Sequence, residues 1–173
     1  MSKKPHSMKI KEDLLQFAKN AVERFLQAHE GLVFYTFSFD CNAEYAEVNL
    51  SFNTKEAFEK TLQHYQSGEY AKYYQTQKDI YNLKYNSGDW QYLCFDTIYV
   101  LEEAEMANIY GDDIERQISD LMHLFRETLV EFTKSAEFTS ISKTDNFMVI
   151  CADHDECIED AMLKLDEVRK AQS

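Results

Sequence analysis

Residues 32–52 read LVFYTFSFDCNAEYAEVNLSF, and this stretch decides the fold. Aromatic and β-branched side chains fill the run from Leu32 to Phe39, and apolar and polar residues alternate from Tyr45 to Phe52. The connection at residues 40–42 (DCN) is typical of a turn. Two short runs joined by such a connection predict an antiparallel hairpin. Because only one face of the second run is apolar, we expect that face to pack inward and the other to meet water.

Helical patterns surround this hairpin. Apolar residues three and four positions apart, together with capping sequences, predict helices over residues 10–29, 57–66, 70–85, 114–132 and 158–168. The acidic residues at 112–115 and at 153–156 are predicted to cap the last two of these helices.

The segment around Trp90 links the two halves of the chain. A turn at residues 85–89 precedes Trp90, and apolar residues continue to Leu101. Their alternation favours a strand followed by a short helix to Tyr110, although the same residues also suit one side of a helix. Short strands are predicted at residues 138–141, on a sheet edge, and at residues 147–151, in the core.

These elements predict a single α+β domain over residues 10–173. It has a small, mainly antiparallel sheet flanked by about five helices. Residues 1–9 are predicted to be a loose N-terminal arm.

The net charge of −13 is concentrated in two short segments. Residues 96–120 contain eight acids and one base, and residues 153–167 contain seven acids and one base. The rest of the chain is balanced, so the whole surplus lies in these segments. A focused negative field repels nucleic acid and anionic lipid and attracts basic proteins. Simple solubility is an alternative explanation, and acids in first helical turns also complement the helix dipole.

Cysteine and histidine residues form no complete catalytic or metal-binding signature. Cys151, His154 and Cys157 are close enough in sequence to supply three metal ligands, but the paired Cys-x2-Cys spacing of structural zinc sites is absent. No apolar run is long enough to span a membrane. We therefore expect a cytoplasmic protein with reduced cysteines, no cofactor, no metal and no enzymatic activity.

Three short stretches together resemble a bacterial family. Residues 34–40 (FYTFSFD), 52–58 (FNTKEAF) and 85–90 (YNSGDW) carry the resemblance, which extends from about Leu14 to Leu165. The family is one of small domains of unknown function that are often encoded beside polymorphic or contact-dependent inhibition toxins. The resemblance implies an immunity role, and it supplies no catalytic residues.

Charge and resemblance together predict a protein that binds and neutralises a cognate toxin, most plausibly a basic nuclease, by stoichiometric occlusion. It is expected to bind neither nucleic acid nor membrane directly. Alternatives are an acidic adaptor for another partner, or an enzyme that uses the Cys/His groups near residue 151. The residues predicted to contact the partner are acids from the two charged segments and three aromatic anchors: Glu102, Glu103, Glu105, Asp112, Asp113, Glu115, Asp153, Asp155, Glu156, Glu159, Asp160, Tyr73, Tyr74 and Trp90.

Overall fold

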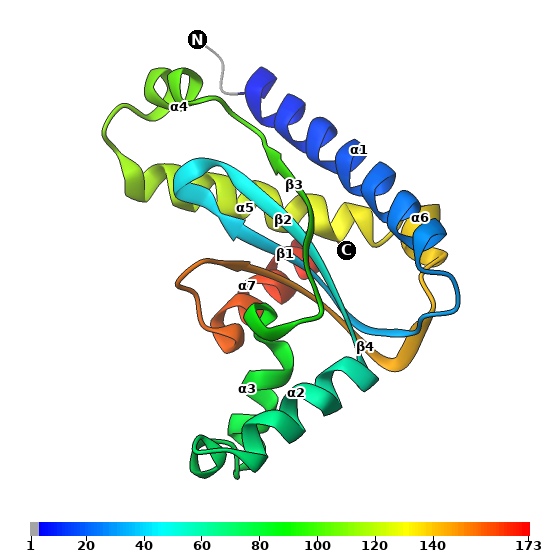
Figure 1. Cartoon of the computed structure of the whole chain (residues 1–173). Helices are drawn as coiled ribbons and strands as arrows, with labels where there is room; N and C mark the ends of the chain where they lie inside the picture. The colour runs from blue at the N-terminus through cyan, green and yellow to red at the C-terminus, as the bar shows by residue number, and fades with distance from the viewer. Residues whose placement is uncertain (1–3) are drawn as a thin grey trace.

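The computed structural model describes residues 4–173, which form a single α+β domain, as predicted (Figure 1). The described residues contain seven α-helices, rather than about five, and one four-stranded sheet. The helices are α1 (Lys4–Ala28), α2 (Lys55–Ser67), α3 (Gln77–Tyr85), α4 (Glu103–Tyr110), α5 (Ile114–Phe132), α6 (Ala136–Thr139) and α7 (Ile158–Ala171). The strands are β1 (Phe34–Asn42), β2 (Glu47–Thr54), β3 (Tyr92–Tyr99) and β4 (Lys143–Asp153).

The sheet has the strand order β3-β2-β1-β4. The predicted hairpin is present, because β1 pairs with β2 in antiparallel orientation, and β3 adds to β2 in the same way. Strand β4 pairs with β1 in parallel. A parallel neighbour needs a long crossover connection, which α4, α5 and α6 provide between β3 and β4. The sheet is therefore mainly antiparallel, as predicted.

An aromatic core fills the face of the sheet that α1 and α5 cover. Phe37 and Phe39 of β1 and Phe52 of β2 are fully buried there. Phe37 lies 4.8 Å from Phe52 and 5.4 Å from Phe132 of α5, measured between ring centroids. Helices α1 and α5 also contact each other, so the two helices form one layer over this face (Figure 1). Burial of these rings is the main stabilising term expected for the domain.

The opposite face of the sheet is largely enclosed. On β2, where the polar face is predicted to meet water, Glu47 and Asn49 are half-buried and Ser51 is buried. Ser38 of β1 and Ser51 and Asn53 of β2 are buried. Asn53 donates a hydrogen bond to the Tyr35 hydroxyl, which in turn donates to the Lys84 carbonyl at the end of α3. Helix α3 and the 3-10 turn η3 (Ser87–Asp89) lie on this side, and their contacts replace water as hydrogen-bond partners.

Strand β1 runs three residues beyond its predicted end. Residues 40–42, predicted as a turn, pair with β2 and belong to the strand. The chain reverses instead in the 3-10 turn η1 (Ala43–Tyr45), and Ala46 takes a left-handed conformation with φ of 53°. The longer strand places Asp40 within the sheet, and this position becomes important for the polar cleft described below.

Helical segments differ from the predictions at four further places. The helix predicted over residues 70–85 is divided into the 3-10 turn η2 (Ala71–Tyr73) and helix α3, which begins at Gln77. Helix α1 begins at Lys4, because Pro5 is tolerated in the first turn, so the predicted loose arm is helical from Lys4. Residues 1–3 of that arm lie outside the described residues. Residues 138–141 are not an edge strand, since residues 136–139 form helix α6, capped by the Ser135 hydroxyl. Helix α7 begins after Cys157, so residues 153–156 form a loop and do not cap it.

Candidate functional site

The last residue of β4, Asp153, and the loop that follows it, residues 154–157, separate two hollows on the surface. We call the hollow between α5 and α7 the acidic groove; its volume is about 920 Å³. We call the hollow between the polar face of the sheet, α3, η3 and this loop the polar cleft; its volume is about 830 Å³. Asp153, Glu156 and Cys157 line both, so the loop is a shared wall.

The acidic groove brings together carboxylates from the two charged segments. Glu115, from the first turn of α5, lines the same groove as Asp155 and Asp160 from the other side. Glu167 of α7, which was not predicted, also lines it. Among the described residues, none of these four acids is within ion-pair distance of a lysine or arginine; the only close cationic group is His154, 3.9 Å from Asp155. The fold thus joins part of the charge that the sequence separates by about forty residues.

A buried ion pair holds the floor of the acidic groove. The Arg126 guanidinium donates from Nη2 to both oxygens of Glu156, at 2.9 and 2.7 Å, and both side chains are only 9% exposed. Lys164 of α7 reaches the same carboxylate from the rim, with Nζ 2.5 Å from Oε1. The Asp153 backbone N–H donates to it as well, at 3.2 Å. Glu156 is therefore occupied by the protein itself and is not available to a partner.

Several other predicted acids also have structural roles. Glu102 and Glu105 form the capping box of α4, and Asp113 caps α5 by accepting the Arg116 N–H. Glu103 and Asp112, beside them, are exposed and form no ion pair among the described residues. These five acids line neither hollow. They lie at the α4 end of the molecule, where α4 contacts α5 (Figure 1).

The remaining predicted acids belong to the polar cleft. Glu159 lines this cleft and lies 3.8 Å from the Lys78 ammonium group, with both side chains exposed. The Asp153 carboxylate accepts the Ala43 N–H at 2.9 Å and so ties the loop to the β1–β2 connection.

The three predicted aromatic anchors are not grouped around the acids. Trp90 is 5% exposed; its indole N–H donates to the Lys84 carbonyl, and its ring packs on Tyr35. It is a core residue, so the prediction that it contacts a partner is wrong. Tyr73 is exposed and Tyr74 is half-buried against Tyr65. Both belong to the α2–α3 connection, at the end of the molecule opposite α4 (Figure 1).

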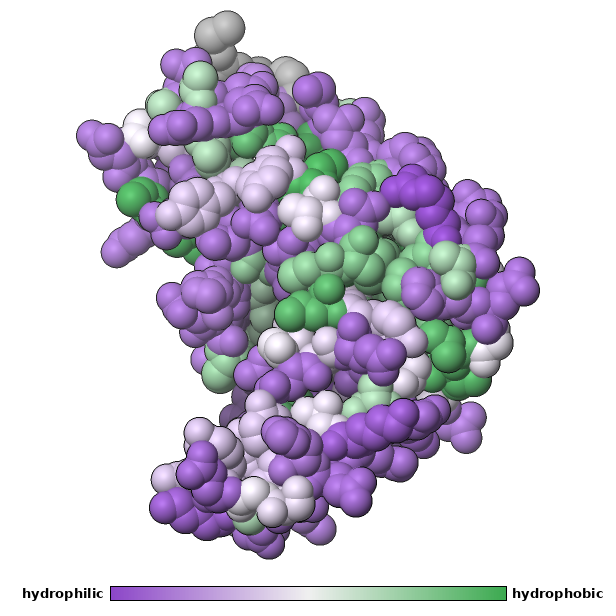
Figure 2. Space-filling view, viewed as in Figure 1, coloured by the Kyte–Doolittle hydropathy of each residue, from purple (hydrophilic) through white to green (hydrophobic). Residues whose placement is uncertain are grey.

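Apolar residues on the face seen in Figure 2 gather in the middle, over β3, and hydrophilic residues surround them. Leu93 and Tyr99 of this edge strand are 40% and 61% exposed. Cys94, between them, has a positive φ of 47°, and its N–H donates to the Ser51 hydroxyl. This kink interrupts the pairing of β3 with β2 between Leu50 and Phe52.

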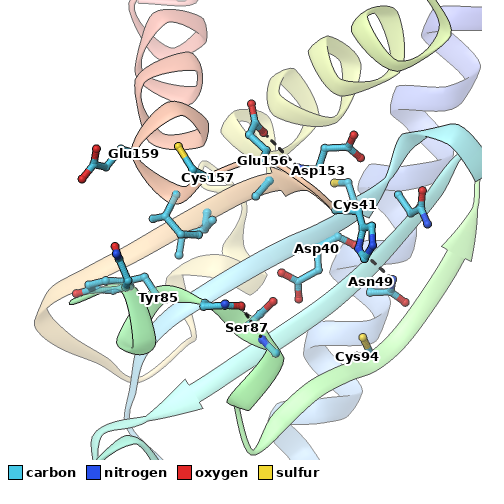
Figure 3. A pocket seen from close by; sticks show the side chains of 18 of the residues that line it. Asp40, Cys41, Asn49, Tyr85, Ser87, Cys94, Asp153, Glu156, Cys157 and Glu159 are labelled. Carbon is cyan, nitrogen blue, oxygen red and sulfur yellow. Dashed lines mark hydrogen bonds between the residues drawn. The ribbon is translucent and has the colours of Figure 1, made fainter. Parts of the chain in front are cut away.

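The floor of the polar cleft carries a carboxylate that the sequence analysis missed. Asp40 projects from β1 towards Ser87 of η3 (Figure 3). Its carboxylate accepts hydrogen bonds from the hydroxyls of Ser38, at 2.8 Å, and Ser51. Burial raises the pKa of the Asp40 carboxyl, although hydrogen bonds from Ser51, Ser38 and Ser87 oppose this shift. Asp40 forms no ion pair with any of the described residues.

Asp40 and its serine neighbours did leave a signal in the sequence. Ser38 and Asp40 alternate with Phe37 and Phe39, and Ser51 lies on the facing strand. The sequence predicts Asp40 in a turn and predicts that the polar face of the second strand, which carries Ser51, meets water; alternation alone does not reveal that another element covers this side. The cover, η3, follows β1 by more than forty residues.

The cysteines and histidines form no metal-binding cluster within residues 4–173. Cys151 is buried beside Cys41, with their sulfur atoms 3.9 Å apart, and both are free thiols. Cys157 and His154 are exposed at the loop. Among the described helices, none combines the length and the apolar character needed to cross a membrane.

Comparison with known proteins identifies a family. The model of the family described as Domain of unknown function (DUF4303) matches residues 14–170, nearly the whole chain. No curated protein and no solved structure gave a match.

Proposed function

The chain belongs to the DUF4303 family, and we propose that it is an immunity protein. In this proposal it binds a cationic toxin, most simply a basic nuclease domain, in a one-to-one complex and blocks the toxin's active site. The observation that carries the proposal is the acidic groove. Glu115, Asp155 and Asp160 from the two charged segments line this one hollow, and none of them has a lysine or arginine partner within residues 4–173.

The electrostatics of the groove suit a basic protein partner. Like charges that share a groove raise the local negative potential, because the carboxylates that line it outnumber its two cations, Arg126 and Lys164. Such a field accelerates the encounter with a cationic surface, which favours an inhibitor that competes with the toxin's substrate. A nuclease active site is itself built to attract polyanions, so an acidic groove is complementary to it.

The ion pair on the groove floor supports the same function by fixing the geometry. Arg126 and Lys164 bind Glu156 and hold the loop that carries Asp155. A preorganised loop loses little conformational entropy on binding, so more of the interaction energy is retained in the complex. Glu103 and Asp112, exposed at the α4 end, extend the negative surface beyond the groove.

The test is co-expression with the product of the adjacent open reading frame in bacteria, scored by growth. The protein should restore growth and co-purify with the toxin at one to one. The variant E115Q/D155N/D160N removes three charges from the acidic groove without touching the capping acids. We expect it to fold normally and to slow association by about tenfold or more at low salt.

A matched control removes three exposed acids that do not line the acidic groove. Variant E12Q/E23Q/E30Q has the same net charge as the groove variant, but its substitutions lie on or beside α1. It should protect cells as the wild type does. Equal loss of protection by both variants would show that net charge alone acts, and full protection by the groove variant would exclude the groove as the contact site. A stable complex with a basic protein that is not toxic would favour the adaptor alternative.

A further inference from the structure

The polar cleft contains a carboxylate whose charge is not compensated. Asp40 is half-buried at its floor, and within residues 4–173 no lysine, arginine or histidine lies within 4.0 Å of its oxygens. Two basic residues line the cleft: Lys78 lies 3.8 Å from Glu159, and His154 lies 3.9 Å from Asp155. Enclosed charges in proteins are normally paired or bind an ion, because desolvation of an isolated carboxylate is costly. An uncompensated one at the floor of an open cleft points to a cationic ligand.

Hydrogen bonds from neighbouring strands hold the Asp40 carboxylate in place. Ser38 from β1 and Ser51 from β2 each bind a different oxygen of Asp40. The Ser51 hydroxyl is itself fixed by the Cys94 N–H, which is available because Cys94 adopts its left-handed conformation. Each carboxylate oxygen has two acceptor positions, so the three serine hydroxyls, that of Ser87 included, leave acceptor capacity unused. The carboxylate is thus preorganised and still able to accept hydrogen bonds from a ligand.

The cleft walls favour a positive ligand of modest size. Glu47 and Glu159 contribute further carboxylates, and Asn82 of α3 has an exposed amide without a hydrogen bond to a described side chain. A volume of about 830 Å³ falls in the range of small-molecule sites. A metal ion fits poorly, since no group of three or more suitable ligands is arranged to hold one in the described part of the chain.

We propose that the polar cleft binds an organic cation through a guanidinium or primary ammonium group, with Asp40 as its counter-ion. The group donates N–H hydrogen bonds to the free acceptor positions of the carboxylate, and the rest of the ligand lies between η3 and the β4–α7 loop. The cation belongs either to a free small molecule or to an arginine or lysine side chain of a bound protein. This site is separate from the acidic groove and does not depend on the immunity proposal.

The test is a titration followed by amide chemical shifts in ¹⁵N-labelled protein. The probes are Nα-acetyl-L-arginine methyl ester and its neutral isostere, Nα-acetyl-L-citrulline methyl ester, so that the guanidinium is the only cationic group compared. We expect arginine ester to shift the amides of Ser87, Gly88 and Cys94 saturably, and citrulline ester to bind at least tenfold more weakly. Variant D40N should weaken arginine ester binding at least tenfold, whereas the control E12Q, on the other layer of the protein, should bind normally. Equal binding of the two esters, or unchanged binding by D40N, overturns the proposal.

Two further measurements extend the test: a peptide titration identifies the source of the cation, and a pH titration serves if D40N does not fold. A capped Gly-Arg-Gly peptide distinguishes the sources: binding of the peptide in preference to the ester supports a protein side chain, the reverse supports a small molecule, and binding of neither overturns the site. If D40N fails to fold, the wild type supplies the test through pH. Because burial raises the pKa of Asp40, affinity must decline on acidification at a pH above that of an ordinary aspartate, about 3.9. Affinity that persists down to the ordinary value contradicts the assignment.

The acidic-groove variant E115Q/D155N/D160N separates this site from the immunity proposal. It should bind arginine ester as the wild type does, since none of its substitutions lines the polar cleft. Loss of ester binding in that variant would place the cation in the groove instead.

Discussion

Removing one charge from the buried ion pair should destabilise the whole domain. Variant E156Q keeps the size of the side chain but replaces one carboxylate oxygen by an amide nitrogen, which cannot accept from Arg126 or Lys164. Breaking a buried pair by changing one partner costs about 3–5 kcal/mol, because the other charge stays buried. The Lys164 side chain is 53% exposed, so water reaches one end of the site. We therefore expect the lower value, about 3 kcal/mol.

Urea unfolding followed by Trp90 fluorescence measures this loss, and thermal melting checks it. For a domain of this length, about 3 kcal/mol corresponds to a fall in melting temperature of roughly 6–12 °C. Variant E131Q is the matched control. It makes the same chemical change on α5, in a pair with Lys134 that is 55% exposed on both sides. Exposed pairs contribute less than about 1 kcal/mol. A loss below 1 kcal/mol in E156Q, or one equal to that in E131Q, would refute the assigned role of the pair.

Two further changes test the two faces of the sheet. Variant D40N should be more stable than the wild type at neutral pH. The raised pKa of Asp40 means that the folded state holds its proton more tightly, so stability falls as pH rises above the ordinary carboxyl pKa. Unfolding at pH 7 and at pH 3 checks this, and a destabilised D40N at pH 7 would contradict it. On the other face, F37A should cost about 4 kcal/mol, because Phe37 is fully buried between Phe52 and Phe132; a urea-unfolding loss below 2 kcal/mol would show that the core collapses around the gap.

Residue spacing was sufficient to predict the type of a secondary-structure element wherever that element buries one regular face. Helix α5 begins after Asp113 and ends at Phe132, as its spacing predicted. The ambiguous segment after Trp90 is a strand and then helix α4, as favoured. By contrast, Phe138 packs on Phe132 from a single helical turn instead of from a strand. Four residues carry too little periodicity to separate these two conformations, and the Ser135 cap was the only local signal.

Long-range contacts decided what the sequence did not reveal about the site. Charge density predicted that the acids at residues 115, 155 and 160 contact a partner. It did not predict that α5, α7 and the loop before α7 place these acids along one groove. It also could not show that Glu156 forms a buried ion pair with Arg126, which lies thirty residues earlier in the chain. Asp40 was missed for the same reason, since the serines and the turn that enclose it come from three separate segments. Pairing partners at such separations depend on topology, which residue spacing does not encode.

The predicted acids fall into two groups, those that bind other groups of the protein and those that do not. This difference is the main physical support for the proposed partner. One group binds the protein's own backbone or cations, and these residues are Glu102, Glu105, Asp113, Asp153 and Glu156. A second group has no lysine or arginine partner among the described residues and comprises Glu103, Asp112, Glu115, Asp155 and Asp160. Three of the second group, Glu115, Asp155 and Asp160, line one groove. Charges of one sign that lie within a Debye length of about 8 Å repel each other, so gathering these acids opposes folding. Solubility alone would be served equally well by acids spread over the surface. In the proposed complex, a cationic surface supplies the countercharge that Glu115, Asp155 and Asp160 lack in the free protein.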